Sequence, residues 1–173
     1  MSRQRITVKT LLSRYAAGVR NFTEIEIVGF GIEPMNLGGA YLGGADFRGS
    51  KWDPDTLFNK VNLSGANLSG VDFSMASFSD ANFRNSNLSN CCFLRSGLDG
   101  VDLRQANLSG ADLRQTNFYG ADLREANLTK VKLMETEFYE AILTRATIDN
   151  DVFWDDCRFK NTVMPDGSIR NGV

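Results

Sequence analysis

The sequence predicts an all-β solenoid: a parallel β-helix of about seven square coils, closed at its N-terminal end by a short α-helix. Large apolar residues recur every five positions, small residues stand two positions before them, and the positions between are polar or glycine. A period of five matches neither the 3.6 of a helix nor the 2.0 of a strand. It fits a chain that turns a corner in every unit, so that four units form a coil of about 20 residues.

The stretch 106–128, ANLSGADLRQTNFYGADLREANL, shows the repeat most clearly. We call the large residue of each unit its centre, and five centres follow one another here: Leu108, Leu113, Phe118, Leu123 and Leu128. The small residues before them are Ala106, Ala111, Thr116, Ala121 and Ala126. Both positions point inward if every unit turns a corner, and stacked coils then pair as parallel strands at ~4.8 Å per layer.

Length and composition fit one domain with a core and argue against several kinds of chemistry. The chain has 173 residues, 42% of them apolar, and a formal charge of −2. Without a polybasic tract, direct binding to nucleic acid is disfavoured. Histidine is absent, which removes the usual general base and the commonest metal ligand. We therefore expect no catalytic residue, no cofactor and no metal site.

The N-terminal segment 1–19 predicts a capping helix. Val8, Leu11 and Tyr15 follow helical spacing over 7–17, with Thr7 as a candidate N-cap and Gly18 just past the end. Such a helix would cover the apolar end of the first coil. Polar residues interrupt the apolar run too often for a signal peptide or a membrane span, and we expect a cytoplasmic protein.

Residues 20–164 predict the β-helix itself. The five-residue register starts weakly at Phe22, with bulky Ile25, Phe30 and Met35 at small positions, and Ile27, Ile32 and Leu37 as the next centres. It slips by one residue near 53–55, which makes Thr56 a small residue and Phe58 a centre. Centres then run without a break from Leu63 to Phe153, and a second slip makes Phe159 and Met164 centres. In the tail 165–173, Pro165-Asp166-Gly167 predicts a turn that folds the end across the last coil.

The corners have their own signal, because glycine recurs two residues after a centre, where a type II turn requires positive φ. These glycines are Gly39, Gly44, Gly49, Gly65, Gly70, Gly100, Gly110 and Gly120. Where Asn85, Asn90 or Gln105 takes the place, the sequence leaves open whether the corner is of another turn type.

Units such as ANLSG, ADLRQ, ADLRE, VNLSG and ANFRN match the A(D/N)LXX consensus, and the chain resembles the pentapeptide repeat family over residues 20 to 164. The resemblance implies a right-handed quadrilateral β-helix with the centre and the small residue inside. The stretch LLxxYxxG-x-R-x-F, Leu11 to Phe22, is similar to the N-terminal cap of cyanobacterial members. Most family members have no assigned biochemistry, one heterocyst-regulating member acts by protein contact, and the fluoroquinolone-resistance members mimic DNA and bind a type II topoisomerase.

Residues 20 apart should stack, so the outer surface can be described as columns. One charged column holds Arg84, Arg104 and Arg124, with Asp102 and Asp122 on the same face. It predicts either a groove for phosphate or carboxylate groups or simple charge pairing, and we favour the pairing. The asparagines Asn67, Asn87, Asn107 and Asn127 beside Ser69, Ser89, Ser109 and Thr129 predict hydrogen-bonded ladders.

Large apolar residues also fall at outward positions near the C-terminal end: Tyr119, Met134, Tyr139, Ile142, Val152 and Trp154. Monomers seldom expose a broad apolar patch without a use. The patch predicts contact with a protein partner or a homodimer, unless the C-terminal tail covers it. The open end of a solenoid is a second candidate for dimer contact.

The three cysteines have no spacing suited to a zinc site or a disulfide framework. Cys91 and Cys157 fall at small, inward positions, and Cys92 faces outward. Asp151 falls at a nominally inward position and indicates local irregularity.

Three functions remain open at this point. A non-enzymatic scaffold that binds a protein fits best, because the chain lacks catalytic groupings and any Gly-rich phosphate loop. A DNA mimic that inhibits DNA gyrase is the alternative, but such a mimic needs a strongly negative face, and here arginines stand among the acidic residues. An enzyme fits least.

Overall fold

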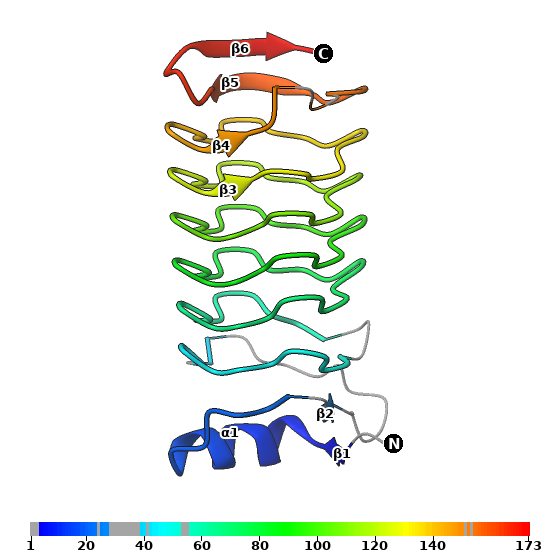
Figure 1. The fold of residues 1–173 in the computed structure, drawn as a ribbon, viewed down its shortest axis with the longest axis vertical. Coiled ribbons are helices and arrows are strands. Elements are labelled where there is room, and N and C mark those ends of the chain that lie inside the picture. Colours follow the sequence, from blue (N-terminus) through cyan, green and yellow to red (C-terminus); the bar gives the residue numbers. More distant parts are fainter. Residues whose placement is uncertain are drawn as a thin grey trace.

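The computed structural model describes residues 4–23, 25–27, 39–40, 42–52, 56–150, 152 and 154–173. The chain forms a rod of stacked coils, with a helix at the N-terminal end and a pair of strands at the C-terminal end (Figure 1). The predicted β-solenoid is confirmed.

The N-terminal end is closed by β1 (Gln4–Ile6) and α1 (Val8–Ala16). Thr7 caps the helix, because its side chain accepts a hydrogen bond from the backbone N–H of Thr10. β1 pairs in parallel with β2 (Ile25–Ile27). The Tyr15 hydroxyl donates to the Gly43 carbonyl at 2.8 Å, which ties the helix to the coil above it. The predicted helix at 7–17 is therefore present and acts as a cap.

The coils stack as parallel strands, and four units make one coil. Each bridged residue pairs with its equivalent four units on, from Leu57 with Ser77 to Asp122 with Ile142. The same spacing joins β3 (Asn127–Leu128) to β4 (Thr147–Ile148). Because the chain turns a corner in every unit, the bridged segments are very short.

The core is a set of stacked side chains along the inside of the rod. Every centre from Leu63 to Leu143 is buried. Phe118, Phe138 and Phe159 stack in successive coils, with ring centroids 5.2 and 5.6 Å apart. Buried hydroxyls at small positions are satisfied as well, since Thr116 donates to the Phe93 carbonyl at 2.7 Å. The residues at the two inward-facing positions of each unit thus form the core.

The corners are more uniform than the sequence predicted. At the predicted glycines φ is positive, for example 72° at Gly110. Asn85, Asn90 and Gln105 also have positive φ, between 58° and 60°. At Asn90 the Cys91 N–H still donates to the Leu88 carbonyl, which closes a four-residue turn with positive φ at its third position. At Asn85, Asn90 and Gln105 the corner thus keeps the positive φ that a type II turn requires at this position, although glycine is not present.

The first coil is longer than the regular ones. A four-unit coil would pair Asn21 with a residue 20 positions later, but its partner Asp46 lies five positions beyond that. The next residues, Phe22 and Phe47, stack with their ring centroids 5.3 Å apart. Five more residues than in a regular coil therefore separate these two paired positions, and the four-unit spacing is wrong for this coil. The predicted positions of Phe30, Ile32, Met35 and Leu37 lie outside the described residues.

The next coil carries the first register slip. Asp46 pairs with Asn67, one position beyond the regular spacing, so one extra residue lies between them. Residues 53–55, where the sequence places the slip, lie outside the described residues. Thr56 and Phe58, which follow them in the chain, are both buried, as expected for a small residue and a centre.

The second register slip falls earlier than the sequence suggested. Glu137 pairs with Arg158, one position beyond the regular spacing, and the Cys157 N–H donates to the Trp154 carbonyl to close the corner. Trp154 is therefore the centre, in contact with Phe138 at 5.7 Å. Val152, two positions earlier, also packs against the core. The prediction that Val152 and Trp154 stand outside was wrong, because a shift of one residue exchanges inner and outer positions. Asp151 and Phe153 lie outside the described residues.

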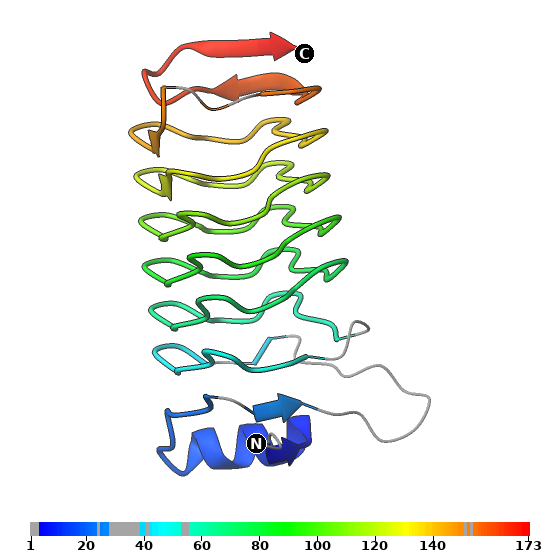
Figure 2. The same ribbon diagram turned by 45° about the vertical axis from the view of Figure 1, so that its right-hand side comes forward.

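The C-terminal end is closed by an antiparallel pair, β5 (Phe159–Val163) and β6 (Ile169–Gly172). The turn between them is closed by the Gly167 N–H, which donates to the Met164 carbonyl at 2.9 Å. Both views show β6 lying over the last coil at the end of the rod (Figures 1 and 2). The tail thus folds across the end, as predicted, and does so as a strand.

Candidate protein-binding surfaces

The charged column consists of closely bonded pairs. Arg104 donates to Asp102 through Nε at 2.8 Å and Nη2 at 2.5 Å, and Arg124 binds Asp122 in the same way at 2.9 and 2.6 Å. The Arg104 Nε also lies 3.6 Å from Asp122 of the next coil. Arg84 is exposed, and within the described part of the chain it forms no ion pair. Charge pairing accounts for this column better than an anion-binding groove, because most of the guanidinium groups are already bonded.

Two further pairs of the same kind were missed in the sequence. Arg48 binds Asp46 at 2.7 Å, and Arg114 binds Asp112 at 2.6 Å. The signal was present: in each case Asp precedes a centre and Arg follows it, as in DFR and DLR. These two positions flank an inward residue and so project to the same side of the rod. Acidic residues at these places are therefore neutralised locally.

The pairs make an acid-dependent contribution to stability. Hydrogen bonds from Arg104 and Arg114 hold the pKa of Asp102 and of Asp112 below the ordinary value. A carboxyl whose pKa is lower in the folded state stabilises it above the unfolded pKa of about 3.9, and this contribution is lost as pH falls through the folded pKa. We expect the unfolding midpoint to fall between pH 7 and pH 3, and to fall less in Arg104→Gln. Thermal unfolding at both pH values measures this, and an equal fall in the two proteins would contradict it.

The asparagine column forms a ladder along one side. The side-chain amides of Asn87, Asn107 and Asn127 each donate to the side-chain oxygen of the asparagine one coil earlier, at 3.2 to 3.4 Å. The same oxygens accept backbone N–H groups two residues on, for example that of Ser109 at 3.1 Å. Because the ladder uses these oxygens internally, it serves the fold and offers little to a ligand.

The predicted apolar patch does not form one surface. Val152 and Trp154 are packed inward, so four of its six residues remain. Tyr119 and Met134 are 47% and 38% exposed, and Tyr139 and Ile142 are half-buried. In the five-residue register these four lie on three successive sides of the rod. A hydrogen bond to Glu140 raises the pKa of Tyr119, so its hydroxyl has a local partner.

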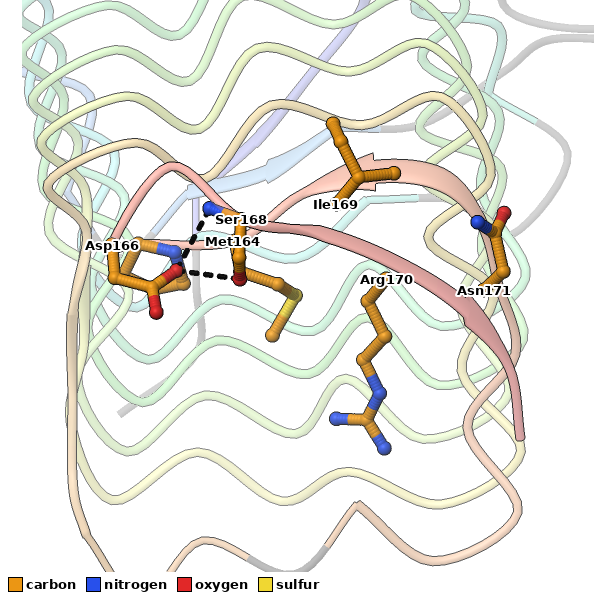
Figure 3. Close-up of a pocket in the computed structure, with 7 residues that line it drawn as sticks. Met164, Asp166, Ser168, Ile169, Arg170 and Asn171 are labelled. Atoms are coloured by element: carbon orange, nitrogen blue, oxygen red, sulfur yellow. Dashed lines mark hydrogen bonds between the residues drawn. The ribbon is translucent and has the colours of Figure 1, made fainter.

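The C-terminal end offers a clearer candidate surface. A hollow lies there, and Figure 3 shows side chains around it from the turn and from β6. Asp166 holds the turn by accepting from the Ser168 N–H at 2.9 Å and its hydroxyl at 2.7 Å. Arg170 lies with its guanidinium 3.9 Å from the centroid of the Phe159 ring. The hollow is lined by Met164, Pro165, Asp166, Ser168, Ile169, Arg170 and Asn171.

Two apolar side chains stand out into solvent at this end. Ile169 is 59% exposed and Val173 is 77% exposed. β6 pairs with β5 along one edge, and among the described residues no strand pairs with its other edge. An exposed strand edge with apolar neighbours is a ready site for another chain. The sequence indicated an open end of the solenoid as a candidate for dimer contact, but it did not indicate an exposed strand edge there.

The cysteines lie where the sequence placed them. Cys91 is fully buried, and burial raises its pKa to about 12. Cys157 is buried too, and burial raises its pKa. Cys92 is half-buried, with its Sγ 3.1 Å from the Ser74 hydroxyl. Within the described part of the chain, no cluster of three or more Cys, Asp or Glu side chains is arranged to hold a metal ion.

These environments predict selective thiol chemistry, because the thiolate is the reactive form. At pH 8, iodoacetamide should modify Cys92 in the folded protein and reach Cys91 and Cys157 only after denaturation. Mass spectrometry counts the modified thiols, and Cys92→Ser should abolish labelling of the native state. Rapid native labelling at Cys91 would contradict the buried position assigned to it.

Comparison with known proteins agrees with this architecture. The pentapeptide repeat family model, "Pentapeptide repeats", matches in eight copies over residues 56–93, 98–133 and 121–150. The chain belongs to the pentapeptide repeat family. It is accordingly a right-handed quadrilateral β-helix. None of the curated proteins matched the sequence.

Several solved pentapeptide repeat structures are similar. A pentapeptide repeat protein from the Arabidopsis thaliana thylakoid lumen is 32% identical, with a TM-score of 0.54 over 56% of this chain and 67% of that one. HetL, a pentapeptide repeat protein involved in heterocyst differentiation regulation in Nostoc sp. strain PCC 7120, is 24% identical over 95% and 100%, with a TM-score of 0.27. QnrB1, a plasmid-mediated fluoroquinolone resistance protein, is 22% identical over 82% of this chain and 83% of that one, with a TM-score of 0.37.

In the described residues, no helix has the length and apolar character needed to cross a bilayer.

Proposed function

We propose that this pentapeptide repeat protein is a non-enzymatic interaction module that binds a partner protein through its C-terminal end. The observation that carries the proposal is the free edge of β6, beside the exposed Ile169 and Val173. A partner strand added there would satisfy the unpaired backbone groups and bury both side chains. The rest of the rod would serve as a rigid support that holds this end in place.

The remaining surface supports this choice over an enzyme. Arg48, Arg104, Arg114 and Arg124 each bind an aspartate, so these charged groups are already paired. The absence of histidine removes the commonest general base. The free thiols fit a reducing compartment such as the cytoplasm.

Affinity capture from the native cell tests the proposal. The full chain should retain a partner protein that Ile169→Asp loses, because a charge at this site opposes burial. Tyr119→Asp is the matched control, since Tyr119 is also exposed but lies on the side of the rod. Loss of the partner in the Tyr119 variant alone, or retention in both, would overturn the assignment to the C-terminal end. Light scattering of the purified chain tells whether the occupant is instead a second copy.

A DNA mimic that binds a type II topoisomerase is the alternative. The bonded Asp–Arg pairs argue against it, because they cancel the acidic columns that would imitate phosphates. We expect no inhibition of DNA gyrase supercoiling at low micromolar protein. Inhibition at that concentration would favour the mimic.

A further inference from the structure

The wall of the β-helix has a gap near its N-terminal end. One unit earlier in the chain, backbone hydrogen bonds still join the two adjacent coils, because the Phe47 N–H donates to the Asn67 carbonyl at 2.7 Å. The equivalent pair one unit on is Trp52 with Asp72, and no backbone hydrogen bond joins these two described residues. The Asp72 N–H, which should donate to the coil below, is also without a backbone partner among the described residues. The two rungs therefore stand apart on this side of the rod.

A hollow of about 310 Å³ lies at the gap and reaches the aromatic core. Its floor is the half-buried Trp52 ring, and behind that ring lie Phe58 and Phe73, which are only 1% and 2% exposed; the Trp52 and Phe58 ring centroids are 5.1 Å apart. Trp52 and Phe73 are 6.4 Å apart, whereas Phe73 and Phe93 in the next coil stack at 5.5 Å. The Trp52 indole N–H is already used, since it donates to the Ser50 hydroxyl at 2.8 Å. The floor is thus apolar, and the groups at the gap that lack a partner among the described residues are the backbone groups of Trp52 and Asp72.

The rim combines opposite charges with an adaptable side chain. Lys51 and Asp72 are both exposed, and Lys51 has no ion pair among the described residues. Met75 is 63% exposed at the neighbouring corner and lines the hollow. A thioether on an unbranched chain adjusts to irregular apolar surfaces, and methionine is common where partners differ in shape.

We propose that this opening in the wall binds an extended peptide segment that carries one large apolar side chain. A peptide group supplies both an acceptor for the N–H groups of Trp52 and Asp72 and a donor for the Asp72 carbonyl. The aromatic floor holds the side chain, and Met75 closes over it. The volume stands at the lower end of the range of about 300–1,000 Å³ for ligand pockets, which suits one side chain better than a large cofactor. The site is at the opposite end of the rod from β6 and does not depend on the function proposed above.

Nuclear magnetic resonance of the ¹⁵N-labelled full chain tests the proposal, with N-acetyl-phenylalanine amide as the probe. The backbone amide signals of Trp52 and Asp72 should shift and saturate, with a dissociation constant on the order of 1 mM for so small a ligand. N-acetyl-alanine amide should bind at least about tenfold more weakly, because it lacks the apolar side chain. Ethylbenzene, which lacks the peptide group, should leave both amide signals in place.

Two variants locate the site. Met75→Glu should weaken the probe at least about tenfold by placing a charge over the apolar floor. Met134→Glu should bind the probe like the original chain, because Met134 is also exposed but lies outside the hollow. Unshifted resonances elsewhere verify that each variant is folded. No saturable shift, equal binding of the alanine probe or ethylbenzene, or equal loss in both variants would overturn the proposal.

Discussion

Leu113→Asp should unfold the rod. Leu113 is a fully buried centre in the middle of the repeat, and its neighbours along the inside of the coil are apolar. An aspartate there would be either an unpaired buried charge or a buried acid without a partner, a change that costs about 4–5 kcal/mol or more. That is a large share of the stability of a domain this size, about 5–15 kcal/mol. Circular dichroism and denaturant unfolding measure the effect.

Ser109→Asp is the control for this prediction. Ser109 follows the neighbouring centre Leu108 and projects outward, so the same new charge stays in contact with water. We expect a change within about 0.5 kcal/mol. A stable, soluble Leu113→Asp protein would show that the register, and with it every inward and outward assignment, is wrong.

Phe118→Ala should lower the free energy of unfolding by about 3–5 kcal/mol without unfolding the protein at room temperature. The ring is fully buried and stacks on Phe138 one coil above, at 5.2 Å. Truncation would leave a cavity that the neighbouring coils cannot fill, because the ladder hydrogen bonds fix their spacing. The midpoint of urea unfolding should fall while its slope stays constant.

Tyr119→Ala is the matched control, since this adjacent aromatic residue is 47% exposed. Its truncation should cost less than about 1 kcal/mol. Similar losses in the two variants would mean that Phe118 does not occupy the core.

The five-residue period predicted most of this fold because it depends on local chemistry. A large residue at every fifth position and a small one two before it fix what faces inward, and each corner closes on itself. The helix at Val8–Ala16 was predictable for the same reason, from Thr7 and the spacing of Leu11 and Tyr15. Charge pairing of Arg104 and Arg124 was predicted, and the pairs at Arg48 and Arg114 could also have been found from the DFR and DLR triplets in the sequence.

The errors arose where two interpretations had the same local support. Phe153 and Trp154 are both large and apolar, so composition did not tell which was the centre; the contact of Trp154 with Phe138 and Phe159 decides it. Likewise, no residue type marks the five additional residues between Asn21 and Asp46, which only the pairing of these two positions reveals. The free edge of β6 follows from the antiparallel turn of the tail, a tertiary feature. The gap beside Trp52 arises from a missing contact between rungs, for which the sequence carries no pattern.

The central claim is that residues 20 apart lie side by side in adjacent coils, and one measurement tests it directly. Ser89 and Ser109 can be changed to cysteine together, in a Cys92→Ser background, and treated with dibromobimane, which becomes fluorescent when it joins two thiols a few ångströms apart. The pair should react, because the spacing between parallel strands is about 4.8 Å. A pair of cysteines at Ser89 and Arg104, 15 apart on neighbouring sides, should not. Joining of the second pair, or failure of the first in a folded protein, would contradict the four-sided coil.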